Sequence, residues 1–218
     1  MDVGVVIAAA GSGRRMGMDV SKVLLPLDRK PILAHSLELF AALDEVSEIV
    51  VVTREVDLKM VTQLIYNLGL SHIARTIPGG DERQGSVYLG LKALSNETQW
   101  VIIHDGARPY VTRELVSKAL QDCYTYKAVT LGVPVTDTIK IVDDGLVVET
   151  PNRANLWSIQ TPQIFSFPLI LKAHEKAKKS GLSATDDCML LEKMGIPVYV
   201  VQGSYGNIKI TTPEDLPS

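Results

Sequence analysis

The sequence predicts an α/β fold with a doubly wound, mostly parallel sheet and one protruding β-hairpin arm. Short β-branched runs that are apolar on both faces alternate with amphipathic stretches of helical period, as expected for buried parallel strands covered by helices. The chain has 218 residues, 46% of them hydrophobic, so it can bury a full core without disulfides or metals. In this architecture ligands bind beyond the carboxyl ends of the strands.

The elements follow one another along the chain in that alternation. The predicted strands are rich in β-branched residues and are Val3–Ala8, Glu48–Thr53, Gln99–His104, Ala128–Pro134 and Ile196–Val201. The predicted helices are amphipathic and are Ile32–Leu43, Val56–Leu68, Arg83–Leu94, Thr112–Tyr124, Leu169–Lys179 and Asp186–Met194. Gly69 and Gly195 stand where helix ends favour a left-handed residue.

Residues 134–155 interrupt the alternation. Two alternating runs, 138–142 and 146–150, are joined by Asp143-Asp144-Gly145, which predicts a β-hairpin. Because an isolated two-stranded ribbon is marginal in water, this one either lies on the main sheet or extends as an arm that pairs with another subunit. We therefore expect one domain over residues 1–218, with residues 134–155 as an insertion that serves dimerisation.

Composition excludes several classes of protein. The formal net charge is −3, which argues against a general nucleic-acid binder. No apolar stretch approaches the ~18 residues of a membrane span, and Asp2 stands where a signal peptide carries positive charge. Cys123 and Cys188 have no partner at metal-ligand spacing, so neither zinc nor a disulfide framework is expected. We expect a soluble cytoplasmic protein without nucleic-acid or membrane partners.

The loop after the first strand is rich in glycine and cations. It reads Ala8-Ala-Ala-Gly-Ser-Gly-Arg-Arg-Met-Gly17, and its small residues let backbone N–H groups approach an anion. Met16 breaks the dinucleotide fingerprint, and a Walker Gly-Lys-Ser/Thr is missing. Arg14, Arg15 and the following Lys22 suit a triphosphate whose leaving pyrophosphate needs its charge neutralised. The alternative is a tight strand–helix turn with solvated basic residues.

Two further motifs suit a nucleotide and a metal. Gly79-Gly80-Asp81 precedes a helix that contains Ser86, and its donors and acceptors can match a pyrimidine edge; the alternative is a helix start capped by Asp81. Asp105 follows a buried strand, where a single carboxylate can help to hold Mg²⁺. The alternative for Asp105 is a turn cap paired with Arg108.

A last motif, Asn207-Ile-Lys-Ile-Thr211, alternates along the chain. Alternation places both isoleucines on one face and the polar side chains on the other. Lys209 is then either a solvated strand-end lysine or a phosphate ligand. His104 is expected in the core or behind the site, because no nucleophilic triad is readable around it.

Taken together, these motifs resemble a known family. The resemblance rests on the opening Ala-Ala-Gly-x-Gly-x-Arg-Met with its following Lys22 and Leu-Pro-Leu-x-x-Lys-Pro-Ile-Leu run, and on Gly79–Val87, His104–Pro109, Thr161–Gln163, Thr185–Asp187 and Asn207–Thr211. In this order they resemble the 2-C-methyl-D-erythritol 4-phosphate cytidylyltransferase family over nearly the whole chain. The resemblance implies a Rossmann-like nucleotidyltransferase fold, CMP transfer from CTP to methylerythritol phosphate in isoprenoid precursor biosynthesis, Mg²⁺ dependence and a homodimer formed through the arm.

The same resemblance implies roles for individual residues. The catalytic cations would be Arg15, Lys22, Arg153 and Lys209, with Arg153 serving the neighbouring subunit's site. The CTP site would comprise Ala9, Ala10, Gly11, Gly13, Gly80, Asp81, Ser86, Asp105 and Ala107, and Asp105 would also hold the metal. The polyol pocket would comprise Arg108, Thr138, Thr161 and Thr185.

Two other functions compete with this interpretation. A ribitol 5-phosphate cytidylyltransferase would share the nucleotide half and differ around Arg153, Thr161 and Thr185. A catalytically silent nucleotide-binding module would not need the polyol-side cation Lys209. A dehydrogenase is disfavoured because the glycine spacing fails.

Overall fold

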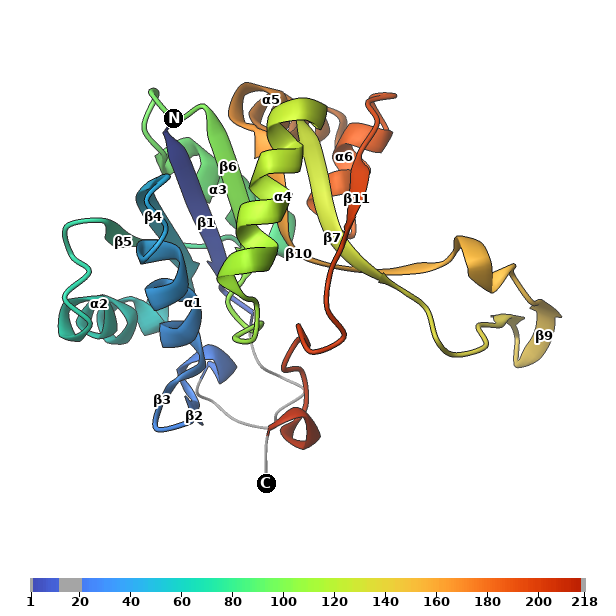
Figure 1. The fold of residues 1–218 in the computed structure, drawn as a ribbon, viewed down its shortest axis with the longest axis horizontal. Coiled ribbons are helices and arrows are strands. Elements are labelled where there is room, and N and C mark those ends of the chain that lie inside the picture. The colour runs from blue at the N-terminus through green and yellow to red at the C-terminus, as the bar shows by residue number, and fades with distance from the viewer. Residues whose placement is uncertain (1, 12–20, 217–218) are drawn as a thin grey trace.

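A computed structural model describes residues 2–11 and 21–216, and its centre is a seven-stranded sheet (Figure 1). The strand order is β11-β7-β10-β6-β1-β4-β5, and every strand except β10 runs parallel to the others. The strands are β1 (Val3–Ala9), β4 (Val46–Thr53), β5 (Ala74–Pro78), β6 (Trp100–Asp105), β7 (Ala128–Pro134), β10 (Trp157–Ser166) and β11 (Tyr199–Gln202). The predicted α/β fold is confirmed.

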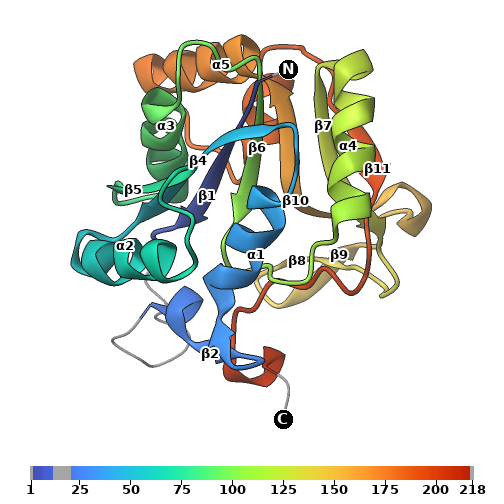
Figure 2. The same ribbon diagram turned by 60° about the vertical axis from the view of Figure 1, so that its left-hand side comes forward.

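Helices cover both faces of the sheet because the central strands are apolar on both. Along β1, Val5 and Ile7 belong to one core and Val6 to the other, as side-chain alternation along a strand requires. The first core is closed by α1 (Ile32–Ala41), α2 (Leu58–Asn67) and α4 (Arg113–Tyr126). The second is closed by α3 (Arg83–Ala93), α5 (Phe167–Ser180) and α6 (Asp187–Glu192), and Figure 2 shows the two layers.

Several shorter elements connect the helices and the strands. They are the 3₁₀ turns Lys22–Leu24, Glu55–Asp57, Arg153–Asn155 and Pro213–Asp215, and the two-residue strands β2 (Pro26–Leu27) and β3 (Lys30–Pro31). Gly69 and Gly195 are left-handed at the ends that the sequence predicts for them. None of the described helices is long and apolar enough to cross a membrane.

Strand β10 was not predicted from the sequence, and it lies in the middle of the sheet. It runs antiparallel between β6 and β7. Pro162 stands in its interior, and a proline cannot donate to a strand ladder, so the segment reads as something other than a central strand. The pairing with β7 shifts register between Gln160 and Gln163, and this irregularity accommodates the proline.

Three other expectations need correction. The edge strand β5 was missed because it is only partly buried. Strand β11 begins at Tyr199 rather than at Ile196. Residues 207–211 form no strand: Ile210 is fully buried, whereas Ile208 is exposed, so the two isoleucines do not share a face. The segment is bound instead by irregular contacts, including an Ile210 N–H bond to the Ala107 carbonyl.

The hairpin forms a sheet of its own. Strands β8 (Ile141–Asp143) and β9 (Leu146–Glu149) pair with each other and with no strand of the main sheet, and Figure 1 shows the arm projecting away from the body. Asp144 and Gly145 both have positive φ, as a tight two-residue hairpin turn requires. The protruding arm is therefore confirmed, and the alternative that it lies on the main sheet is wrong.

Candidate active site

A cavity of about 490 Å³ opens where β1 and β6 end. It is lined by Ala8, Ala9, Ala10, Gly11, Lys22, Val23, Gly80, Asp81, Glu82, Arg83, Ser86, Asp105, Ala107, Lys209 and Thr211. Ten of the residues that were predicted for the catalytic and CTP sites are therefore brought together. Gly13 and Arg15 lie outside the described residues.

The glycine loop before α3 lies directly against the end of β1. A Cβ added to Gly79 would stand 2.8 Å from the Ala10 Cβ and from the Ser86 Oγ, so only glycine permits this approach. The Gly80 N–H donates to the Ser86 Oγ at 3.1 Å, which ties the loop to the first turns of α3. Asp81 is exposed and does not cap the helix, whose N-cap is Glu82. The alternative interpretation of Asp81 as a cap is wrong.

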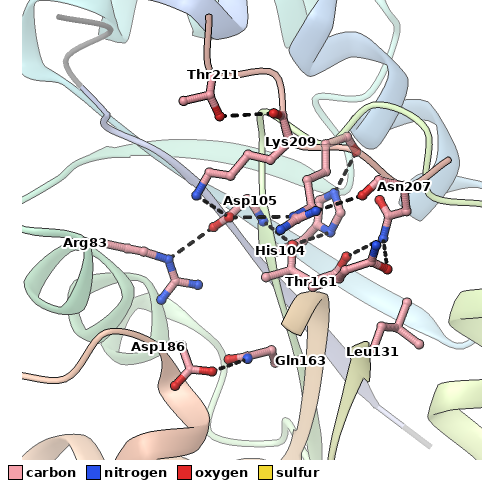
Figure 3. A network of polar contacts seen from close by, with 12 residues as sticks. Arg83, His104, Asp105, Leu131, Thr161, Gln163, Asp186, Asn207, Lys209 and Thr211 are labelled. Atoms are coloured by element: carbon pink, nitrogen blue, oxygen red, sulfur yellow. Dashed lines mark hydrogen bonds and ion pairs between the residues drawn. The ribbon is translucent and has the colours of Figure 1, made fainter. Parts of the chain in front are cut away.

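Asp105 lies at the centre of a cluster of cations (Figure 3). Its Oδ2 is 2.7 Å from the Lys209 Nζ, and its Oδ1 accepts a hydrogen bond of 3.1 Å from the Arg83 Nε. The Arg108 Nε is 3.9 Å from Oδ2. One carboxylate thus gathers cations from α3, from the β6–α4 loop and from the C-terminal segment.

The same contacts decide the charge of Asp105. Burial by itself would raise the pKa of its carboxyl, but Arg83 and Lys209, with a smaller effect of Arg108, hold that pKa well below its usual range. The Arg83 pKa is raised: burial would lower it, and Asp187 and Asp105 outweigh burial. Asp105 and Arg83 are therefore both charged at neutral pH.

Thr161 and His104 form the layer beneath Asp105. The Asp105 N–H donates to the Thr161 Oγ1 at 3.0 Å, and that hydroxyl also contacts the His104 Nδ1 at 3.2 Å. The His104 Nε2 is 3.1 Å from the Arg108 carbonyl, and burial lowers the His104 pKa to about 4. His104 is thus a fully buried support of the loop, as expected, rather than a group exposed to a ligand.

Asn207 attaches the C-terminal segment to this layer. Its side-chain amide donates to the Thr161 carbonyl at 2.9 Å, and its own carbonyl accepts a hydrogen bond of 2.7 Å from the Arg108 Nη1. Lys209, two residues later, is thereby placed against Asp105. Asn207 was named in the sequence motif, but its buried structural role has no signal in the sequence.

A second cavity of about 410 Å³ adjoins the first. It is lined by Arg83, Asp105, Arg108, Ile159, Gln160, Thr161, Gln163, Thr185, Asp186, Met189, Glu192 and Lys209. Three of the four predicted polyol-pocket residues are among them. Arg83, Asp105 and Lys209 line both cavities, so this charged row marks the place where the two meet.

Two predicted site residues lie elsewhere. Thr138 and Arg153 are exposed on the arm and line neither cavity. The Arg153 Nη1 donates to the Thr136 carbonyl at 2.8 Å, and this contact is local to the arm. A single chain therefore does not bring these two residues to the site.

Sequence reasoning assigned no role to Arg83, although it stands inside the Gly-Gly-Asp-Glu-Arg motif. Its guanidinium joins Asp105 to the buried Asp187, whose carboxylate is 2.8 Å from the Arg83 Nη1. The only available signal was the position of Arg83 in that motif, because Asp187 is 104 residues away along the chain.

Metal binding would have to rest on few carboxylates. Within residues 2–11 and 21–216, no group of three or more His, Cys, Asp or Glu side chains is placed to hold a metal ion. The first cavity nevertheless presents Asp105 together with Asp81 and Glu82. An ion that takes most of its ligands from phosphate and water needs no more than one or two of these.

Chemically, the arrangement suits the meeting of two anionic ligands. The small residues at the end of β1 and the Gly80 loop suit a nucleotide. Arg83 and Lys209, the cations that line both cavities, suit phosphate groups that approach from either side. Neither described cysteine can supply a nucleophile, since Cys123 and Cys188 are buried and burial raises both thiol pKa values.

Comparison with known proteins agrees with this geometry. The family model described as 2-C-methyl-D-erythritol 4-phosphate cytidylyltransferase matches residues 3–218. A protein of that name from Desulforamulus reducens is 49% identical over 213 residues, which are 97% of this chain and 91% of the relative. The crystal structure of 4-diphosphocytidyl-2C-methyl-D-erythritol synthase from Anaerococcus prevotii aligns with a TM-score of 0.87 at 36% identity, covering 98% of this chain and 92% of that one.

A second solved structure shows the same likeness at lower sequence identity. The 2-C-methyl-D-erythritol 4-phosphate cytidylyltransferase of Francisella tularensis aligns with a TM-score of 0.85 at 31% identity, over 99% of this chain and 96% of that one. The match of the family model spans both cavities, the arm and the C-terminal segment. The chain therefore belongs to the 2-C-methyl-D-erythritol 4-phosphate cytidylyltransferase family.

Proposed function

We propose that this protein transfers CMP from CTP to 2-C-methyl-D-erythritol 4-phosphate, giving 4-diphosphocytidyl-2-C-methyl-D-erythritol and pyrophosphate for isoprenoid biosynthesis. The observation that carries the proposal is the pair of cavities that meet at Arg83, Asp105 and Lys209. One cavity has a glycine loop suited to a nucleotide, and the other has polar side chains suited to a polyol. Family membership agrees with this assignment.

The reaction is a displacement at phosphorus. A phosphate oxygen of methylerythritol phosphate attacks the α-phosphorus of CTP, and the bond from that phosphorus to the bridging oxygen of the β-phosphate breaks. Pyrophosphate leaves with the electron pair of that bond. The attacking phosphate is already anionic, so the chain needs no general base, and catalysis depends on alignment and charge neutralisation.

The nucleotide half of the site has two tasks. The backbone of Ala9, Ala10 and Gly11 receives the nucleotide, and the Gly80 loop that Ser86 holds faces the cytosine. Lys22 lies in the same cavity and stabilises negative charge on the α-phosphate and the leaving group. Arg15 is predicted to act beside it, and this role rests on the family resemblance.

The acceptor half positions the attacking phosphate. Lys209 and Arg108 face the second cavity, where Thr185 supplies a hydroxyl for the polyol. The Thr161 hydroxyl is already engaged by the Asp105 N–H and by His104. We therefore assign Thr161 to supporting Asp105 more than to binding the polyol directly.

The carboxylate of Asp105 fits a role as a Mg²⁺ ligand. It is anionic, and each of its oxygens accepts one contact of 3.1 Å or less from a described residue, which leaves acceptor capacity on both oxygens. Mg²⁺ typically combines one or two carboxylates with phosphate oxygens and water. When bound, the ion would supply charge neutralisation of the CTP phosphates; Asp105 would hold it.

We further propose a homodimer formed through the arm. Ile141, Val142 and residues 146–148 leave apolar side chains exposed on a narrow ribbon, and such a patch marks an interaction site. A partner chain that covers the arm would let Arg153 reach the neighbouring site, where a planar guanidinium suits phosphate. A cytoplasmic location follows from the proposed substrate, because CTP is an intracellular metabolite.

Pyrophosphate release tests the proposal. The purified protein is incubated with CTP and Mg²⁺ and with either methylerythritol 4-phosphate or ribitol 5-phosphate. We expect release with the first acceptor only. Release with ribitol phosphate alone would keep the CTP site and overturn the polyol assignment, whereas no release with either acceptor, under conditions in which CTP still binds, would favour a silent nucleotide-binding module.

A further inference from the structure

A second line of buried polar contacts runs behind the site and ends at His174 on α5. The His174 Nε2 is 3.1 Å from the Asp187 Oδ1, and the Asp187 Oδ2 is 2.8 Å from the Arg83 Nη1. The side chains of His174 and Asp187 are both 1% exposed. His174 lines neither of the two cavities that meet at Asp105.

Arg83 connects this buried pair to the site. Its Nη1 faces Asp187, and its Nε donates to Asp105 at 3.1 Å. A guanidinium is planar and its donors are fixed relative to one another. An arginine that is held at one end by Asp187 therefore presents its other donor to Asp105 in one orientation.

Asp187 can hold Arg83 only if its own carboxylate is fixed and charged. Burial would raise the Asp187 pKa, but Arg83 and the hydrogen bond from His174 keep that pKa below its usual range. Among the described residues each carboxylate oxygen has one partner, and the Asp187 N–H donates to the Gln163 Oε1 at 3.2 Å. The His174 contact is thus the one that keeps Oδ1 satisfied inside the protein.

We propose that the buried His174–Asp187 pair is a positioning device, which orients the Arg83 guanidinium and through it the Asp105 carboxylate at the junction of the two cavities. His174 and Asp187 act through Arg83 and touch no substrate. This inference rests on the proposed function, because it concerns the alignment of the two phosphates at that junction. Misplacement of an aligning group by about 1 Å can cost a hundredfold in rate.

The decisive experiment separates the hydrogen bond of His174 from its packing. His174→Phe keeps a ring beside Tyr88, whose ring centroid is 6.3 Å from that of His174, but it removes the donor to Asp187. His174→Gln keeps an N–H donor near the same place. We expect His174→Phe to lower kcat between about tenfold and a hundredfold with little change in the KM for CTP, and His174→Gln to recover most of the loss.

A control variant measures what loss of stability alone does. Ile170→Val lies on the same helix in a fully buried apolar position, and it should lower the melting temperature without changing kcat. Equal losses of kcat in His174→Phe and His174→Gln would overturn the inference, as would a kcat that falls in all three variants in proportion to stability. If His174→Phe does not fold, Asp187→Asn replaces it, and an unchanged kcat in Asp187→Asn overturns the inference as well.

A double-mutant cycle tests whether His174 acts through Arg83. In an Arg83→Lys background, whose own kcat is reduced, His174→Phe should change kcat by less than about twofold, because coupled residues are not additive. If the effects of the two substitutions on kcat are fully additive, His174 does not act through Arg83 and the inference is overturned. Wild-type turnover is measured first: its absence refutes the proposed function, whereas normal wild-type turnover with unaffected variants refutes only the positioning role.

Discussion

The carboxyl edge of the sheet and the arm both carry cations predicted to bind phosphate, but they hold them differently. At the edge, Lys209 is fixed 2.7 Å from Asp105, and Arg83 is held between two carboxylates. On the arm, Arg153 is exposed, its guanidinium donates to the nearby Thr136 carbonyl, and it forms no ion pair with another described residue. The cations at the edge are therefore preorganised within one chain, whereas Arg153 needs a second chain before it can contact a phosphate.

The largest effect is expected at the edge. Lys22→Ala should lower kcat by roughly a hundredfold to a thousandfold, because the variant loses a cation aimed at the charge that develops on the phosphates. Circular dichroism and the melting temperature should stay unchanged. Lys30→Ala, in the same region but paired with Glu38 on the surface, is the matched control. Near-normal turnover of Lys22→Ala would refute its role.

The next prediction decides whether the arm serves its own chain or its partner. Arg153→Ala and Lys209→Ala should each lose most activity as homodimers, about tenfold or more through loss of a phosphate contact. Unfolding and refolding the two together should restore about a quarter of the wild-type rate, because half of the dimers would be mixed and each would hold one intact site of two.

The mixed-dimer experiment gives a different result if Arg153 acts within its own chain. In that case each site of a mixed dimer still lacks either Arg153 or Lys209, and the mixture stays as inactive as its components. Two Arg153→Ala preparations refolded together give the baseline.

The third prediction tests whether the arm forms the dimer interface. Val147→Asp places a charge on the exposed apolar ribbon, where Val147 is 61% exposed, and should shift the protein from dimer to monomer in analytical ultracentrifugation. Val56→Asp, on a surface valine outside the arm, should leave the dimer intact. A dimer that survives Val147→Asp would contradict the proposed interface.

A smaller effect, on the free energy of unfolding, is expected at Thr161 beneath Asp105. Thr161→Val removes the acceptor of the buried Asp105 N–H, and an unsatisfied buried donor costs about 1–3 kcal/mol in the free energy of unfolding. Thr125→Val, on an exposed position of α4, should change that free energy by less than about 0.5 kcal/mol. Equal values from urea unfolding for the two variants would contradict the supporting role of Thr161.

The smallest effect concerns acid stability. Because the pKa of Asp105 is lower in the folded protein than in the unfolded chain, its stabilising contribution is complete above about pH 5 and is lost progressively as pH falls further. The free energy of unfolding of wild type minus that of Asp105→Asn should therefore shrink between about pH 5 and pH 3. A difference that stays constant over this range would be inconsistent with the ion pairs of Asp105.

The sequence predicted local features well and long-range pairings poorly. Strand β1, the helices and the Asp-Asp-Gly turn follow from short periodic patterns, and Asp105 was placed at the edge because a buried strand ends there. Strand β10 was missed because Pro162 and two glutamines are not typical of a buried central strand. The joining of Arg83 to Asp187 and of Asn207 to Thr161 depends on residues 104 and 46 positions apart, and no local pattern encodes such pairings.

The position of β10 also limits the order in which the strands can pair while the chain is being synthesised. β6 and β7 are separated in the sheet by this strand, which lies after both in the chain. A chain that emerges from the ribosome with its N-terminus first can thus pair β1, β4, β5 and β6, but β7 has no place to join them until residues 157–166 have been synthesised. The same strand brings Thr161 beneath Asp105. The end of β1 and the Gly80 loop, which face the nucleotide, can thus form early in synthesis. Lys209 and the half that receives the acceptor are added only near its end.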